Sequence, residues 1–185
     1  MKSKLCIIIG SFIITISLLL IINDKFTEYK AGINSKEILT IINEIESSNK
    51  NKTLEKVTIK GHNYIGTITI PSLNISLPVL DTWNDDNLKI APSLYYGSSI
   101  DKMIICAHSY KTHFKNIGKL KQNDYIIFKT IDENEFIYKV EEVEILSQTD
   151  VDKMINNNFN LTLYTCTKDG TKRITVRCNL INLPF

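Results

Sequence analysis

The feature that most constrains the fold of this chain is an uninterrupted apolar run near its N-terminus. The eighteen residues from Leu5 to Ile22 contain no charged side chain, and two lysines lie just before them, at Lys2 and Lys4. Eighteen residues of α-helix rise about 27 Å, which is close to the hydrocarbon thickness of a bilayer. The run therefore predicts a transmembrane helix, and the lysines place the N-terminus in the cytoplasm and the rest of the chain outside the cell.

A cleaved signal peptide is the alternative explanation of this run. Cleavage needs small residues just after the apolar core, in an A-x-A arrangement. Residues Leu19 to Asn23 offer none, which favours an anchor that stays attached. We therefore expect a single-pass protein of the cell membrane.

The rest of the chain divides into a stalk and one globular domain, as the total of 185 residues allows. Isoleucines recur at helical spacing from Ile38 to Ile45, which predicts one short amphipathic helix, and the polar residues 47–53 predict a linker. The predicted division is residues 1–22 as cytoplasmic tip and anchor, 23–60 as stalk with a short helix, and 61–185 as the domain.

Charge and cysteine content narrow the function. The formal net charge is +2 and the basic residues are scattered, so we expect no nucleic-acid partner, which would need a concentrated basic face. The cysteines are Cys6, Cys106, Cys166 and Cys178, and Cys6 lies in the membrane run. An odd number remains outside, so at least one is expected to be a free thiol.

From Tyr64 onward the chain has the pattern of a series of short strands. Apolar and polar residues alternate from Ile68 to Val79, with a break at Pro71. Met103 to Ala107 is continuously apolar, as in a strand that is buried on both faces. Further strands are predicted over residues 125–131, 136–145, 161–166 and 173–181, whereas residues 83–96 predict a long connection with a turn or short helix. The fold class is therefore dominated by β-structure, either a small barrel or a sandwich.

The last two predicted strands can be paired residue by residue. If residues 167–172 form the hairpin loop, Cys166 lies opposite Arg173. One face of the pair is then mostly apolar, with Leu161, Leu163, Ile174, Val176 and Cys178. The other face is polar and carries Cys166 and Arg173 beside the turn. A slip of one residue would mix the faces, so the pattern supports this register.

A thiol beside a guanidinium suits nucleophilic chemistry, because the cation favours thiolate and can hold a carbonyl oxygen. The alternative is a surface pair that meets by chance. The nucleophile also needs a base. His62 lies in a polar stretch and His113 in a loop, whereas His108 follows the buried run, where a rigid strand end can hold a general acid/base accurately. A histidine that merely caps the strand remains the alternative for His108.

Three segments resemble motifs of the sortase family of cysteine transpeptidases. Leu161 to Cys166 resembles the T-L-x-T-C motif, which ends a strand with the nucleophile. Ile105 to Ser109 resembles the segment that bears the sortase histidine, and Arg173 to Arg177 resembles the strand that begins with the essential arginine. The likeness runs in the same order from about Tyr64 to Ile181.

The resemblance implies an eight-stranded β-barrel with short helices after an N-terminal transmembrane helix, in a class B-like or D-like member. It makes residues 61–185 the catalytic domain, with Cys166 as nucleophile, His108 as acid/base and Arg173 as the positioning cation. Such an enzyme cleaves an L-P-x-T-G type sorting signal on a secreted protein. An amine on cell-wall peptide or on a pilin then resolves the thioacyl intermediate.

No cofactor or required metal is expected. Some relatives bind calcium through acidic loops, but Asp85-Asp86 and Glu141-Glu142 do not space their oxygen donors as a calcium loop does, so calcium is left open and not indicated. Two other functions remain open. One is another extracellular Cys-His cell-wall peptidase, and the other is a non-catalytic, membrane-tethered β-barrel binding module.

Overall fold

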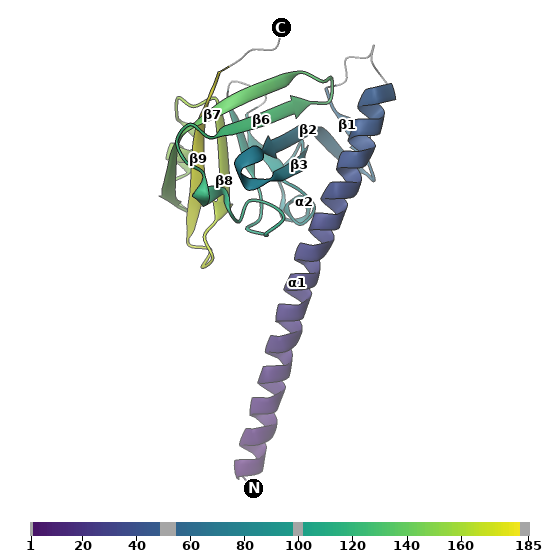
Figure 1. Ribbon diagram of the computed structural model, residues 1–185. Coiled ribbons are helices and arrows are strands. Elements are labelled where there is room, and N and C mark those ends of the chain that lie inside the picture. The colour runs from purple at the N-terminus through teal and green to yellow at the C-terminus, as the bar shows by residue number, and fades with distance from the viewer. Residues whose placement is uncertain (1, 49–54, 98–101, 182–185) are drawn as a thin grey trace.

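The computed structural model describes residues 2–48, 55–97 and 102–181 as one long helix leading to a β-barrel (Figure 1). The helix is α1 (Lys2–Ser48), and two short helices, α2 (Asp85–Leu88) and α3 (Val151–Ile155), lie in connections of the barrel. Single 3₁₀ turns are η1 (Pro71–Leu73) and η2 (Ile117–Lys119). The strands are β1 (Val57–Ile59), β2 (His62–Ile70), β3 (Ile75–Leu80), β4 (Ser93–Tyr96), β5 (Met103–Cys106), β6 (Tyr125–Thr130), β7 (Glu135–Ser147), β8 (Leu161–Cys166) and β9 (Lys172–Leu180).

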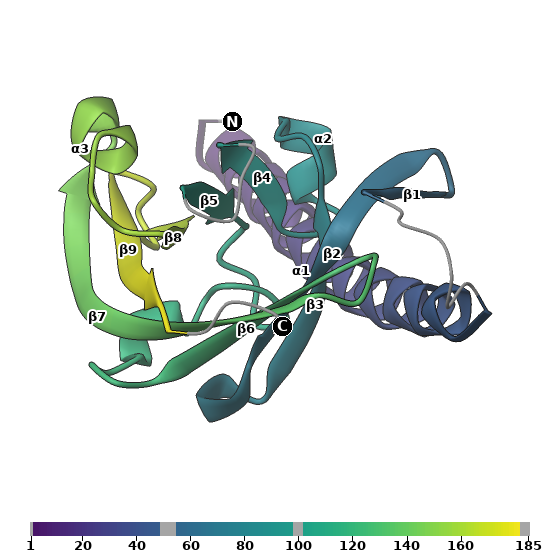
Figure 2. The same ribbon diagram turned by 90° about the horizontal axis from the view of Figure 1, so that it is seen from above.

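Eight of these strands form a closed barrel, which confirms the predicted fold class. The order is β2-β3-β4-β5-β8-β9-β7-β6, and β6 pairs back onto β2. β1 adds to β2 outside this ring. Seen from above, the strands curve around a common interior (Figure 2). The inward side chains fill it, and Ile68, Ile105, Leu163 and Val176 are fully buried.

The β8–β9 hairpin has the predicted register at every pair. Cys166 lies opposite Arg173, and Thr162 lies opposite Arg177. The predicted apolar face points into the barrel, because Leu161 and Cys178 belong to its core. The alternation of apolar and polar residues therefore fixes which side chains lie outside, as a period of two requires.

The helix α1 differs from the predicted anchor, stalk and short helix, because it is continuous from Lys2 to Ser48. No proline occurs before Pro71, so nothing in this segment removes a helical hydrogen bond. Ser47 and Ser48 of the predicted linker are helical, and residues 49–53 lie outside the described part of the chain.

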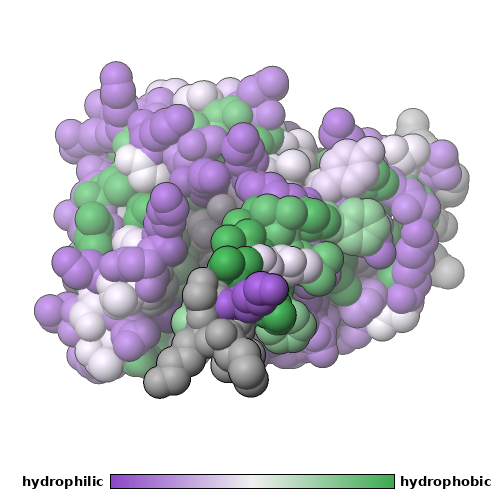
Figure 3. All heavy atoms as spheres, turned by 90° about the horizontal axis from the view of Figure 1, so that it is seen from below, coloured by the Kyte–Doolittle hydropathy of each residue, from purple (hydrophilic) through white to green (hydrophobic). Residues whose placement is uncertain are grey.

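The two halves of α1 have different surroundings. Among the described residues it is the one helix long and apolar enough to cross a membrane, with a mean hydropathy of 2.6 in its most apolar window. Seen from its N-terminal end, hydrophobic atoms gather on the helix, whereas the barrel surface beside it is mainly hydrophilic (Figure 3). In the C-terminal half, Ile38 and Ile42 are buried in a second core with Ile59, Tyr64 and Leu80. This half is therefore packed on the barrel and does not hold it at a distance.

Replacing Ile42 with alanine tests this packing. Ile42 is 1% exposed, so the free energy of unfolding should fall by about 2–5 kcal/mol, the range for large-to-small changes in a core. Ile33 is 47% exposed on the same helix, and Ile33→Ala is the matched control that should change little. Denaturant unfolding of the full-length protein in detergent can be followed by the fluorescence of Trp83, the single tryptophan. Equal midpoints for the two variants would contradict the packing.

Candidate active site

Parallel pairing of β5 and β8 brings His108 and Cys166 together. Cys106 pairs with Tyr164, and the Ala107 amide donates to the Tyr164 carbonyl at 3.2 Å, one residue beyond β5. A second hydrogen bond links the two strand ends: the Thr165 hydroxyl donates to the Ala107 carbonyl at 2.8 Å. Parallel neighbours end at the same edge, so extending the register by two residues places His108 beside Cys166.

Arg173 comes to the same edge from β9, across a tight turn. The Thr167 amide donates to the Lys172 carbonyl at 3.0 Å, and Gly170 has the left-handed φ of 75° that favours glycine. Hydrogen bonds from Thr167 and Thr171 hold the pKa of Asp169 down at about 2. Arg173 itself donates from Nη1 to the carbonyls of Gly170 and Lys172, at 2.9 and 3.1 Å. The strand registers thus place the three predicted site residues at the same end of the barrel.

Burial separates the four free thiols from one another. Cys106 and Cys178 are buried, which raises the pKa of Cys106 to about 12 and that of Cys178 further above its ordinary value. Both therefore stay protonated and poorly nucleophilic. Cys6 lies in the apolar part of α1, whereas Cys166 is partly exposed at the end of β8. Cys166 is the accessible thiol of the barrel.

The three histidines are also distinguished by burial. His108 is half-buried with its ring 4.9 Å from that of Tyr110, and burial lowers the pKa of its imidazole, an effect that Asp85 partly offsets. The neutral imidazole, which can accept a proton, is thereby favoured. His62 begins β2 and is partly exposed. His113 lies in a loop as predicted, but it is almost fully buried, and this lowers its pKa to about 4.

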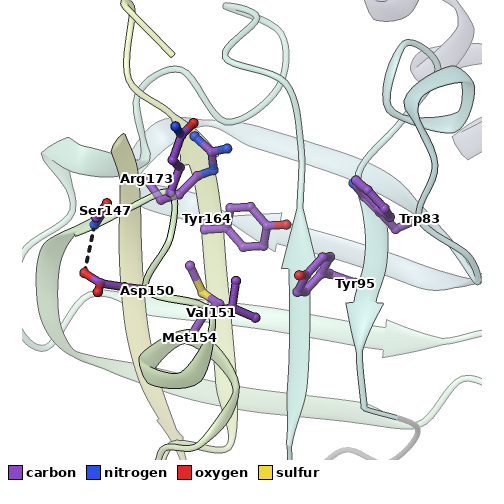
Figure 4. A pocket seen from close by; sticks show the side chains of 9 residues that line it. Trp83, Tyr95, Ser147, Asp150, Val151, Met154, Tyr164 and Arg173 are labelled. Carbon is purple, nitrogen blue, oxygen red and sulfur yellow. Dashed lines mark hydrogen bonds between the residues drawn. The ribbon is translucent and has the colours of Figure 1, made fainter. Parts of the chain in front are cut away.

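A pocket of about 220 Å³ lies beside Arg173 on the outer face of β8 (Figure 4). Three aromatic rings line it: Trp83 and Tyr95 meet edge to face with centroids 5.5 Å apart, and Tyr95 meets Tyr164 in the same way at 5.4 Å. Val151 and Met154 of α3 form another wall. These side chains were not predicted from the sequence, although Tyr164 shares the outward parity of Cys166 along β8, which is a signal that could have found it.

Arg177 lies on the same face of β9 as Arg173, four residues further from the β8–β9 turn. Its side chain is buried and hydrogen-bonded. Its Nε donates to Glu144 at 2.8 Å, and Nη1 donates to the Thr162 hydroxyl at 3.0 Å. Nη1 and Nη2 also donate to the carbonyls of Met154 and Lys153, at 3.3 and 2.8 Å. Arg177 therefore holds the C-terminal part of α3, the wall of the pocket, against the barrel.

The acidic pairs at Asp85-Asp86 and Glu141-Glu142 do not form a metal centre in the described structure. Among the described residues, no three or more His, Cys, Asp and Glu side chains are grouped so that they could hold an ion. The carboxylate of Asp86 pairs with Lys89 at 2.8 Å, and Glu141 pairs with Lys139 at 3.2 Å. The expectation that no metal is required therefore stays an expectation.

Comparisons with known proteins agree with this architecture. A family model described as a sortase domain matches residues 68–181. The chain therefore belongs to the sortase family and is a cysteine transpeptidase. A comparison with curated proteins finds no match.

Solved structures of several sortase classes resemble this chain. Sortase A from Listeria monocytogenes is 27% identical with a TM-score of 0.60, covering 65% of this chain and 89% of that one. The Clostridium perfringens sortase D5 transpeptidase is 24% identical with a TM-score of 0.65, covering 80% and 99%. Clostridium perfringens sortase C, solved with the C-terminal cell wall sorting motif, is 25% identical with a TM-score of 0.58, covering 80% and 89%. These neighbours leave the subfamily of this chain unresolved.

Burial of His113 predicts a pH dependence of stability. Its folded pKa of about 4 lies below the ordinary 6.5, so between these values the unfolded chain binds a proton that the folded chain does not. Stability is then lost as the pH falls through this window, by about 2 kcal/mol between pH 7 and pH 5 for this residue. His113→Gln should remove that share of the loss. Denaturant unfolding at the two pH values measures it, with His62→Gln as control, and an unchanged pH slope in His113→Gln would contradict the prediction.

Proposed function

We propose that this sortase cleaves an L-P-x-T-G type sorting signal on a secreted protein and transfers the acyl group to an amine of cell-wall peptide or of a pilin. The observation that supports the proposal is the strand register, which pairs Cys166 with Arg173 and brings the β5 end that precedes His108 to the same barrel edge, beside an aromatic pocket. The likeness to a sortase C solved with a cell wall sorting motif supports the substrate class.

The proposed reaction has two steps. Neutral His108 first takes the proton of the Cys166 thiol, and the resulting thiolate attacks the threonine carbonyl of the signal. The His108 imidazolium then gives this proton to the leaving amine as the threonine–glycine bond breaks. The product is a thioester on Cys166. His108 then takes a proton from the incoming amine, which attacks the thioester, forms a new amide and releases the Cys166 thiolate.

In this proposal Arg173 stabilises the oxyanion that forms at the threonine carbonyl. It lies opposite Cys166 on the neighbouring strand, and both of its hydrogen bonds to the turn come from Nη1. A guanidinium has five N–H donors in a fixed fork, so further donors can face the substrate. A donor fixed in advance lowers the barrier without reorganisation during the reaction.

The aromatic pocket is proposed to bind the residues that precede the threonine. Trp83, Tyr95 and Tyr164 offer ring faces and edges that suit leucine and proline side chains. Tyr164 lies two residues before Cys166 on β8, on the same face of the strand. A peptide bound along this face would therefore present its next residues to the thiol.

The proposed location is the cell membrane, with α1 as a single-pass anchor, its N-terminus in the cytoplasm and the barrel outside. The turn between β8 and β9 points toward the same side as the apolar half of α1 (Figure 1). In this orientation the site faces the membrane, where a secreted protein that has just crossed it would pass.

Incubating the full-length protein with a library of sorting-signal peptides tests the nucleophile and the motif together. Mass spectrometry should find a thioacyl adduct on Cys166 that is absent in Cys166→Ala and at least about a hundredfold slower to form in His108→Ala. Cys106→Ala and Cys178→Ala should keep the adduct, because both of those thiols are buried away from solvent. An adduct on another cysteine would refute the assignment, and a Cys166→Ser variant with full function in cells would favour the binding module.

Alanine substitutions of the two arginines of β9 should have different effects, one on activity and the other on stability. Arg173→Ala should keep the unfolding midpoint and lower transpeptidation by about a hundredfold, because an oxyanion donor is lost. Arg177→Ala should lower the unfolding midpoint, because Glu144 and the carbonyls of α3 lose a buried partner. Kinetics and thermal unfolding of both purified variants decide this. A larger catalytic loss in a well-folded Arg177→Ala would show that the site is wrongly assigned.

A further inference from the structure

The loop that follows His108 is held against α1, outside the barrel. Glu28 accepts a hydrogen bond from the Lys111 amide at 2.6 Å, across 83 positions of sequence. Gly32 lies so close to Thr112 that a Cβ at this position would be 2.7 Å from Cγ2 of the threonine. Ser35 Oγ lies 3.4 Å from Nε2 of His113. Three consecutive loop residues thus meet three residues of one helix face.

These contacts are partly shielded from water on the helix side, although Lys111 and Thr112 of the loop are exposed. The Glu28 side chain is 14% exposed, and the hydrogen bond from Lys111 is the main cause that lowers the pKa of its carboxyl. Ser35 and His113 are both buried. A hydrogen bond from a backbone amide to a carboxylate is charge-assisted and stronger than a neutral one. The contact is therefore a specific attachment and not a chance approach of two surfaces.

The loop transmits this attachment to His108. The Tyr110 ring lies between the two histidines, 4.9 Å from His108 and 5.5 Å from His113. The Phe114 amide donates to the His108 carbonyl at 3.3 Å, and Phe114 is buried in the barrel core. The loop is fixed by the core on one side and by α1 on the other, with His108 at its start.

The spacing of residues along α1 explains how one helix can contact both the barrel and the loop that follows His108. Glu28, Gly32 and Ser35 are separated by four and three residues, and Ile38 and Ile42 continue the same spacing. Residues at such intervals share one helix face. The C-terminal part of this face, with Ile38 and Ile42, is apolar and packs on the barrel. The part before it, from Glu28 to Ser35, is small or polar and contacts the loop after His108.

We propose that Glu28, Gly32 and Ser35 of α1 are positioning residues for the transpeptidation, which hold His108 in place through the loop of residues 109–115. The inference rests on the proposed function, because it assigns His108 the proton transfers. The membrane helix is then a working part of the active site as well as an anchor. The helix contributes to kcat, because none of these three residues lines the pocket beside Arg173.

Substitutions at the contact test this inference in the full-length protein. Gly32→Ala brings a methyl group against Thr112 Cγ2, and Glu28→Ala removes the acceptor of the Lys111 amide. Since misplacing a catalytic group by about 1 Å can cost about a hundredfold, each variant should lower kcat for thioacyl formation by at least about tenfold, with KM unchanged. Hydrogen exchange of residues 109–115 should become faster, whereas that of β8 should not change.

Two rescues separate positioning from a general loss of structure. Glu28→Gln keeps an oxygen acceptor and should retain most of the activity. Adding Thr112→Ser to Gly32→Ala removes the clashing Cγ2 and should restore both kcat and the slow exchange. Ile33→Ala, an exposed position on the same helix, is the control that should match the wild type.

The outcomes distinguish this inference from the proposed function. Unchanged loop exchange in Glu28→Ala and Gly32→Ala overturns the inference, whether or not a substrate has been found. Unchanged kcat in these variants, with an active wild type, also overturns it and leaves the proposed function standing. A wild type that forms no thioacyl adduct with any library peptide overturns the proposed function, and the exchange comparison still decides whether α1 holds the loop.

Discussion

The parallel pairing of β5 with β8 is the constraint on which the site depends. Antiparallel neighbours end at opposite edges, so a His and a Cys at their carboxyl ends would lie a strand length apart. The chain avoids this by completing β6 and β7 on the far side of the barrel before it returns as β8 beside β5. The hairpin to β9 then adds Arg173 at the same edge. Both β5 and β8 are fixed in the core, so the edge is rigid before any substrate binds.

The single continuous helix α1 has three parts with different surroundings. Its first part exposes apolar side chains suited to lipid, its middle accepts a loop backbone, and its last part packs isoleucines on the barrel. Glu28 is six residues beyond Ile22, which is about 9 Å of helix rise. The loop that follows His108 is therefore held about one and a half helical turns from the end of the apolar run. In the proposed membrane location, this short distance would set the height of the site above the bilayer.

What the sequence could predict depended on how local the signal was. The β8–β9 register was predicted at every pair, because two short strands of period two and a Gly-containing turn leave few alternatives. Strand β4 was missed, because an irregular register between Leu94 and Tyr96 breaks the alternation that would have revealed it. The continuity of α1 was not predicted, because the helix face between the apolar run and Ile38 has no row of large apolar residues. Its contacting or buried residues are Glu28, Ala31 and Ser35, which are charged, small or polar. Burial of His113 depends on that same contact, 78 positions away along the chain from Ser35.

Arg173 and Arg177 show how position along one strand separates chemistry from support. They share a face of β9, and parity alone cannot distinguish them. Arg177 lies among groups that satisfy its donors: the Glu144 carboxylate, the Thr162 hydroxyl and two carbonyls of α3. A guanidinium held this way is neutralised and immobile, so it can keep the pocket wall in place but cannot follow a developing charge. Arg173 stands at the turn, where its hydrogen bonds to other described residues run from Nη1 to carbonyls of its own hairpin. Neutral carbonyls leave its charge uncompensated, and this is the condition under which a cation beside a thiol can stabilise an oxyanion.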